Sequence, residues 1–196
     1  MNKRANRVSL LLLAAIALGG CSNDQIVAPP AGASSSPTPT PITIATEEDA
    51  IAAANETAQQ FLRIWDDITL SESPTDISPL EEVARDAALD TVQNIEDRAS
   101  DLGYTVIKGG TNWTLLDGQS FAASATFQGE EMPFGVVTLF GCADYSDTIG
   151  TNAAGEEVPP LGPWKNQLTL AYWPDEKRWY VTEFDTLQDQ SEECAD

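Results

Sequence analysis

The chain of 196 residues contains 31 acidic residues, 10 basic residues and no histidine, and its formal net charge is −21. Such a charge repels nucleic-acid phosphates and anionic lipid headgroups, so we expect no nucleic-acid partner. Without histidine, the chain lacks the commonest general base, the commonest zinc ligand and any serine–histidine–aspartate triad. These absences argue against an enzyme, and we expect no catalytic residues, no metal and no other cofactor.

The N-terminal segment has the layout of a secretory signal peptide. An apolar run from Val8 to Leu18 follows three basic residues, Lys3, Arg4 and Arg7. A retained membrane-spanning helix is the alternative. As a helix, however, residues 8–20 would be about 20 Å long, which is short of the ~30 Å hydrocarbon core of a membrane. We therefore predict that residues 1–20 are a signal peptide.

The sequence Leu18-Gly19-Gly20-Cys21 resembles the lipobox of bacterial lipoproteins. In that family the cysteine thiol receives a diacylglycerol, commonly carrying palmitate, and the cysteine becomes the new N-terminus. The resemblance implies that Cys21 is lipidated and that the protein is anchored to the cell membrane on its extracytoplasmic face. A diacylglycerol supplies the two acyl chains that stable attachment requires.

Residues 21–45 follow as a tether rich in proline, serine and threonine. Its prolines are Pro29, Pro30, Pro37, Pro39 and Pro41. Such a composition cannot bury a core, so we predict disorder, with a reach of roughly 25–75 Å. Residues 46–196 are of a suitable length for one globular domain.

Two helices are predicted at the start of this domain. Thr46 and Asp49 have capping-box spacing, which predicts a helix over residues 47–69. Its apolar residues recur at helical spacing: Ile51, Ala54, Ala58, Phe61, Leu62, Trp65 and Ile68. Helix-start signals in Ser78-Pro79-Leu80-Glu81 predict a second helix, which runs to Leu102 and is capped by Gly103.

Beyond Gly103 the apolar residues alternate, which indicates strands. The predicted strands are residues 104–108, 112–116, 120–128, 135–142, 167–173 and 178–184. Asp117-Gly118 predicts a hairpin between the second and third strands. A long polar loop is predicted from Asp144 to Trp164, and a turn at Pro174–Lys177. Helices followed by antiparallel strands make an α+β fold.

This order of elements, with Phe61-x-x-x-Trp65 on the first helix, resembles the nuclear transport factor 2-like (cystatin-like) superfamily. More narrowly, Val136–Asp147 resembles a segment of a group of actinobacterial lipoproteins of unknown function, in which a Cys-x-Asp-x-Ser pattern closes a strand. The likeness extends over roughly residues 47–185. It implies two helices packed on a curved antiparallel sheet of about four to six strands, which together enclose a cone-shaped cavity.

Cysteine usage also points to export. If Cys21 carries lipid, Cys142 and Cys194 remain as a pair. In an exported chain such a pair predicts a disulfide. Two free thiols or a redox pair are the alternatives, although the chain has no Cys-x-x-Cys motif.

The predicted domain is rich in aromatic residues, most of which we expect to fill its core. The alternative is that some line an open pocket for an apolar ligand. The residues expected to line it are Phe61, Trp65, Trp113, Phe127 and Trp179. The acidic loop after Asp144 lacks the spacing of an EF-hand, so we expect it to be solvated instead of holding calcium.

These features favour a non-enzymatic surface lipoprotein that serves as a binding or accessory module of the cell envelope. Its expected partners are the membrane, through Cys21, and either an envelope protein or an apolar ligand. The alternative function is a small-molecule isomerase or dehydratase that uses the cavity of the same fold. An enzyme of that kind needs a carboxylate of raised pKa facing the cavity.

Overall fold

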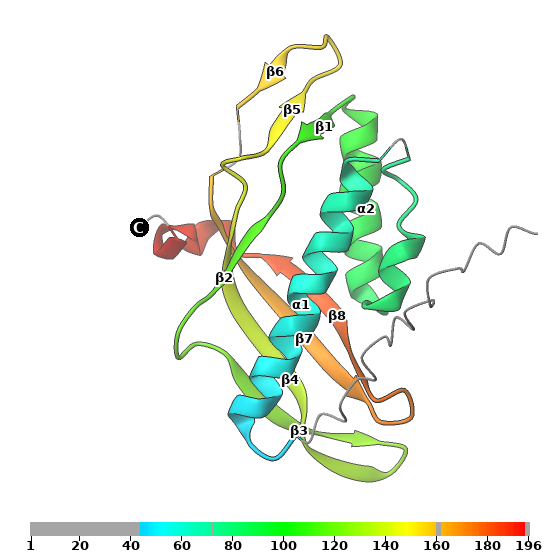
Figure 1. The fold of residues 1–196 in the computed structure, drawn as a ribbon, viewed down its shortest axis with the longest axis vertical. Coiled ribbons are helices and arrows are strands. Elements are labelled where there is room, and N and C mark those ends of the chain that lie inside the picture. The colour runs from blue at the N-terminus through cyan, green and yellow to red at the C-terminus, as the bar shows by residue number, and fades with distance from the viewer. Residues whose placement is uncertain (1–43, 72, 160–161, 195–196) are drawn as a thin grey trace, which may run out of the picture. The chain divides into compact units, whose positions relative to one another are not determined.

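The computed structural model describes residues 44–71, 73–159 and 162–194. The predicted signal peptide, Cys21 and the tether as far as residue 43 lie outside the described residues. Within the described residues, no helix is both long enough and apolar enough to cross a membrane. The described elements run α1, η1, α2, β1 to β8 and η2 (Figure 1), which confirms the predicted α+β class.

Helix α1 (Glu47–Thr69) begins and ends where the sequence predicts. The backbone N–H of Asp49 donates to Thr46 Oγ1 at 3.1 Å, and the backbone N–H of Thr46 donates to the Asp49 carboxylate at 3.2 Å, so the capping box is formed. The buried residues of α1 are Ala50, Ala53, Ala54, Ala58, Phe61, Leu62 and Ile68. Four of these are alanines in the first half of the helix, which lets that half approach the sheet closely.

The predicted second helix is two separate elements. Ser78–Glu82 forms the 3-10 helix η1, and α2 covers Ala87–Asp101. Between them, Val83 and Arg85 each make a backbone hydrogen bond of 2.9 Å with Val181 in strand β8. The prediction of one continuous helix was therefore wrong. Pairing with a sheet edge outweighs the local helix preference of this segment, as tertiary context commonly does.

The larger sheet has five antiparallel strands. They are β2 (Asn112–Leu115), β3 (Phe121–Phe127), β4 (Glu130–Asp144), β7 (Trp164–Trp173) and β8 (Arg178–Thr186). Strand β4 is central: it pairs with β2 and β3 along one side and with β7 along the other, and β8 pairs with β7. All five correspond to predicted strands, although β4, β7 and β8 are longer than predicted.

The hairpin predicted at Asp117-Gly118 was wrong. Strands β2 and β3 do not pair with each other, because both pair with β4, one near each end of that strand. Strand β4 has 15 residues and is long enough to hold both partners. The hairpin is instead formed by β3 and β4, which turn at Gln128 and Gly129, and both of these residues have positive φ.

A smaller sheet of three strands combines one predicted strand, residues 104–108, with two strands that were not predicted. Gly103, with φ of 63°, ends α2 as predicted, and β1 (Thr105–Lys108) follows. Strand β1 pairs with β5 (Ile149–Thr151), which pairs with β6 (Glu157–Val158). The segment Asp144–Trp164 is therefore not one long loop. Strands of two and three residues leave almost no periodic signal, and they form here because β1 supplies a partner.

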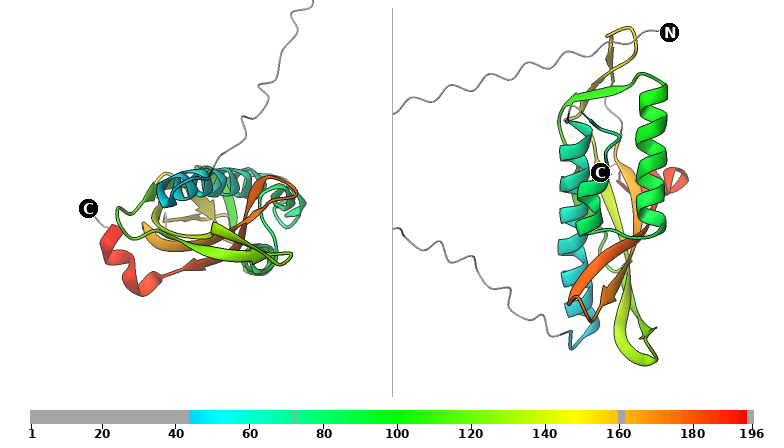
Figure 2. Two further views of the ribbon diagram at one scale, coloured as in Figure 1. Left: turned by 90° about the horizontal axis from the view of Figure 1, so that it is seen from below. Right: turned by 90° about the vertical axis from the view of Figure 1, so that its right-hand side faces the viewer.

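The apolar core lies between α1 and the larger sheet. Helix α1 packs across β3, β4 and β8, and α2 packs beside β8 (Figure 2). The largest apolar side chains with no exposed surface are Phe61, Leu80, Leu139, Leu168, Leu170, Val92, Val137 and Val181.

The structure confirms the disulfide between Cys142 and Cys194, whose sulfur atoms are 2.01 Å apart. It joins the central strand β4 to the C-terminal 3-10 helix η2 (Gln188–Cys194), which packs against β7. A second link lies nearby, because Lys165 Nζ donates to Glu193 at 2.9 Å. The acidic C-terminal segment is thereby held on the sheet.

Candidate functional site

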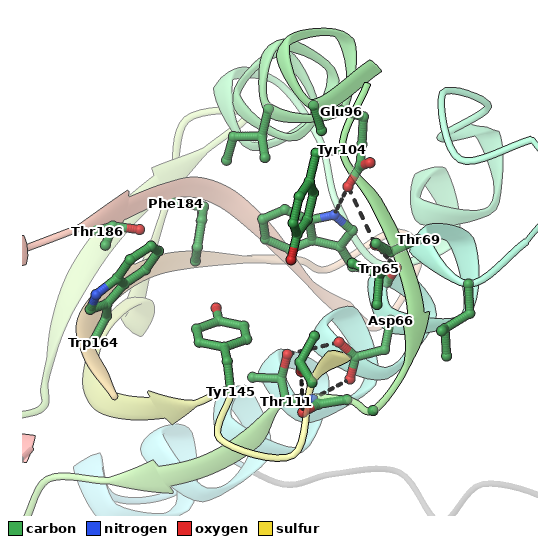
Figure 3. A pocket seen from close by; sticks show the side chains of 17 residues that line it. Trp65, Asp66, Thr69, Glu96, Tyr104, Thr111, Tyr145, Trp164, Phe184 and Thr186 are labelled. Atoms are coloured by element: carbon green, nitrogen blue, oxygen red, sulfur yellow. Dashed lines mark hydrogen bonds between the residues drawn. The ribbon is translucent and has the colours of Figure 1, made fainter. Parts of the chain in front are cut away.

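A pocket of about 180 Å³ lies where the C-terminal half of α1 meets α2, the smaller sheet and the ends of β7 and β8. Seventeen residues line it (Figure 3). Its mouth lies between the end of α1 and the exposed side of α2, because Leu70 and Ile95 line the pocket and yet are 42% and 40% exposed. A ligand can therefore enter without unfolding either helix.

Five aromatic side chains form much of the wall and surround an open space in Figure 3: Trp65, Tyr104, Tyr145, Trp164 and Phe184. Two pairs are in direct contact. The ring centroids of Trp65 and Phe184 are 5.2 Å apart with an interplanar angle of 89°, and those of Tyr145 and Trp164 are 5.8 Å apart at 62°. These are favourable edge-to-face arrangements, so the wall is held in place by its own packing.

Glu96 brings a carboxylate into this aromatic wall. Its side chain is only 5% exposed, and its Oε1 atom accepts hydrogen bonds from Trp65 Nε1 at 2.5 Å and from Thr69 Oγ1 at 3.3 Å. No described residue donates to the other oxygen, Oε2. Burial raises the pKa of Glu96, and the two hydrogen bonds offset only part of that rise.

Asp66 supplies a second carboxylate from α1. It accepts hydrogen bonds from the backbone N–H of Thr111 at 2.8 Å and from Thr111 Oγ1 at 2.7 Å. The two glycines before Thr111 allow close packing on both sides. A Cβ atom at Gly109, where φ is 111°, would stand 2.4 Å from Thr148 Cα, and one at Gly110 would stand 3.2 Å from Asp66 Oδ2. Burial raises the pKa of Asp66, the bonds from Thr111 lower it, and the neighbouring Asp67 raises it slightly.

Tyr145 lines the pocket near the sheet, and the buried amide of Asn166 lies close to it outside the lining. Burial raises the pKa of the Tyr145 hydroxyl, the nearby amide of Asn166 lowers it, and the charge of Asp66 raises it further. Asn166 has no exposed surface, and its side-chain oxygen and nitrogen make no hydrogen bond of good geometry within the described residues. Burial of an amide without good partners is costly, so this end of the domain is not packed for stability alone.

Of the five residues predicted to line a cavity, only Trp65 lines this pocket. The other four do not line it, and each has a different place: Phe61 is fully buried in the core, Trp113 donates its Nε1 hydrogen to Asn55, Phe127 packs on Trp173 and Trp179 is 4% exposed beside Tyr172. The reason is that the pocket forms beyond the filled core, at the end of α1. Trp164, at the end of the segment predicted as a long polar loop, also lines the pocket.

The sequence did contain a signal for Glu96. Ala88 and Val92 are fully buried on α2, and Glu96 continues the same spacing of four residues onto that apolar face. A charged residue within an apolar stripe is rarely buried unless it has partners or a function. No comparable signal marks Tyr145, which lies beyond a strand end.

No protein-family model matches the chain, and no curated protein matches it. Among solved structures, the intermembrane space region of the chloroplast protein ARC6 is similar, with a TM-score of 0.41 and 13% sequence identity. The match covers 68% of this chain and 95% of that chain. We transfer neither fold nor function from this match.

Proposed function

We propose that this protein is a non-enzymatic binding module of the cell envelope, anchored to the outer face of the membrane through lipid on Cys21. It would hold a small, largely apolar ligand in the pocket between α1 and α2. The observation that carries this proposal is the aromatic-walled pocket of about 180 Å³ with its own mouth. A comparable apolar cavity of roughly 150 Å³ admits benzene, so the pocket is large enough for a group the size of one ring.

Two further features support the location. The lipobox-like sequence ending in Cys21 supports lipidation, and the Cys142–Cys194 disulfide is typical of proteins that work in an oxidising compartment. We also propose the finer fold assignment, the nuclear transport factor 2-like cone, on the strength of the element order and the pocket beside the first helix. An envelope protein as partner remains the alternative within the same binding role.

Ligand binding can be tested on the full chain in a nonionic detergent, with toluene as the probe and saturation-transfer NMR as the measurement. We expect toluene to bind and Ala99→Phe to abolish its binding, because Ala99 lines the pocket and the added ring would fill it. Ala87→Phe is the matched control, since Ala87 lies exposed at the start of α2. Absence of toluene binding, or equal loss in both variants, would contradict the proposal.

The anchor has its own test. In a bacterial host, Cys21→Ala should move the protein from the membrane fraction to the soluble fraction and abolish labelling by radioactive palmitate. Cys142→Ala serves as the control for loss of a cysteine, and it should stay in the membrane fraction. A Cys21→Ala protein that remains membrane-bound and labelled would rule out this anchor.

A second candidate function, a cavity isomerase or dehydratase, is favoured by one observation. Asp66 and Glu96 both line the pocket, and burial raises the pKa of both. A buried carboxylic acid can stabilise a developing oxyanion, and a second carboxylate can move a proton. Against this, both oxygens of Asp66 and one of Glu96 already accept hydrogen bonds from the protein.

The enzymatic alternative predicts proton exchange. Cyclohexanone in deuterated buffer should exchange its α-hydrogens faster with the protein than without it, and Asp66→Asn should remove the difference. If cyclohexanone exchanges its α-hydrogens no faster with the protein than in buffer alone, the result supports the binding function and not the enzyme.

A further inference from the structure

We propose that the pocket selects organic cations, that is, ligands whose alkylammonium group lies among the aromatic side chains and faces Glu96 and Asp66. This inference rests on the proposed ligand-binding function and adds the chemical class of the ligand. It depends on three features of the described residues: the charge of the lining, the partners of each carboxylate oxygen and the aromatic wall.

The lining contains two carboxylates, Asp66 and Glu96, and no lysine or arginine. An anionic ligand would meet both carboxylates without any counterion, which is unfavourable at low dielectric. A neutral apolar ligand would exclude water from the pocket and leave the two carboxylates without a counterion. An organic cation compensates the negative charge of these carboxylates, so the charge of the lining favours it.

The aromatic wall points to the same class. The face of an aromatic ring attracts a cation, and several rings together recognise alkylated ammonium groups. In this pocket the rings of Trp65 and Phe184, and those of Tyr145 and Trp164, stand at steep angles to one another. Ring faces are therefore presented in more than one direction around the open space in Figure 3.

A metal ion fits this site less well than an organic cation. Calcium takes six to eight oxygen ligands and magnesium about six. Nowhere in the part of the chain that the structure describes do three or more aspartate, glutamate or cysteine side chains gather closely enough to hold a metal. Both oxygens of Asp66 are already engaged with Thr111, which leaves Oε2 of Glu96 as the free carboxylate oxygen.

The net charge of the whole chain also favours a cationic ligand. A net charge of −21 attracts cations toward the protein and repels anions over distances longer than a hydrogen bond. Apolar groups of the ligand can extend through the mouth, where Leu70 and Ile95 are partly exposed. An amine or quaternary ammonium compound with apolar substituents fits both the carboxylates inside the pocket and the apolar residues at its mouth.

Three probes of nearly equal shape and different charge test the inference: choline, its neutral isostere 3,3-dimethylbutan-1-ol, and 3,3-dimethylbutanoate. Each is titrated into the full chain in nonionic detergent and followed by tryptophan fluorescence, since Trp65 and Trp164 line the pocket. We expect choline to bind at least tenfold more tightly than the alcohol and the carboxylate not to bind. Alcohol affinity equal to or above that of choline overturns the inference and leaves the ligand-binding function standing. If none of the three probes nor toluene binds, the proposed function falls as well.

Two variants test whether the pocket carboxylates cause the preference for choline over the alcohol. Glu96→Gln and Asp66→Asn can each keep the hydrogen bonds made by the native side chain, because an amide oxygen still accepts and an amide N–H can donate to the Thr111 hydroxyl. Each should weaken choline binding at least tenfold and change alcohol binding less than twofold. Asp97→Asn removes the same charge from an exposed position beside Glu96 and should change neither affinity by more than twofold. Unchanged choline binding in Glu96→Gln and Asp66→Asn would overturn the inference.

Discussion

The two halves of helix α1 lie in different surroundings. In the first half, alanines pack closely against the sheet and leave no space, and Phe61 is fully buried at the end of this filled region. In the second half, Trp65, Asp66 and Thr69 line an open pocket. One amphipathic stripe thus serves both a core and a cavity. The difference shows that helical periodicity identifies the inward face of a helix but does not reveal whether that face is filled.

The comparison predicts the largest effect in the filled half. Phe61→Ala should lower the free energy of unfolding by about 3–5 kcal/mol, because close packing around Phe61 leaves no way to close the void. Chemical denaturation measures the loss. Ile95→Ala at the pocket mouth, where the side chain is 40% exposed, should cost less than about 1 kcal/mol. Equal losses at both positions would break the distinction between the two halves.

Removing the disulfide tests how much this bond stabilises the sheet on which α1 packs. Replacing Cys142 and Cys194 together by serine should lower the free energy of unfolding by about 2–4 kcal/mol, since the bridge closes a long loop in the unfolded chain. The residues are separated by 52 positions. Denaturation of the wild type with and without reductant provides the control, and a reduced wild type as stable as the oxidised protein would contradict the prediction.

The pocket half should respond to pH through Glu96, whose pKa in the folded protein lies above its ordinary value of 4.5. The folded state therefore holds the proton more tightly than the unfolded state. The contribution of Glu96 to stability is fully present below about pH 4.5 and is lost as the pH rises through the raised pKa, by about 1.4 kcal/mol for each unit of that rise. The titratable groups that share the pocket are Asp66, Tyr104 and Tyr145.

Glu96→Gln should remove this loss, so the variant should be more stable than the wild type at pH 7 and no more stable at pH 4. Thermal unfolding at both pH values measures the difference. Asp97→Asn, at an exposed position on the same helix, should lack this pattern. A Glu96→Gln variant less stable than the wild type at pH 7 would argue against a destabilised carboxylate.

The smallest effect is expected at the start of the filled half. Thr46→Ala removes the side chain that accepts from the Asp49 N–H, and it should cost about 1 kcal/mol. Thr57→Ala, in the interior of α1, is the control and should cost less. Because the cap lies at the far end of α1 from the pocket, choline affinity should not change in Thr46→Ala. A change in affinity would mean that the two halves are coupled.

Local rules were sufficient for much of the fold. The bounds of α1 followed from Thr46, Asp49 and the apolar stripe, because capping and periodicity depend on neighbours in the chain. The α+β class and the strands of the larger sheet followed in the same way, whereas the pairing of Cys142 with Cys194 followed from the number of cysteines left once Cys21 is assigned to lipid. Predictions failed where a partner distant in sequence decides, as at Val83, which pairs with Val181 instead of continuing a helix.

The sequence by itself determined the bounds of α1, which face of α1 turns inward and where the strands of the larger sheet lie. Only the tertiary structure decided where the inward face stops being core and becomes a pocket. The physical reason is that the pocket is made of contacts between distant segments: Glu96 meets Trp65 across 31 positions, and Thr111 meets Asp66 across 45. Such contacts follow from how the elements pack, which no local pattern encodes.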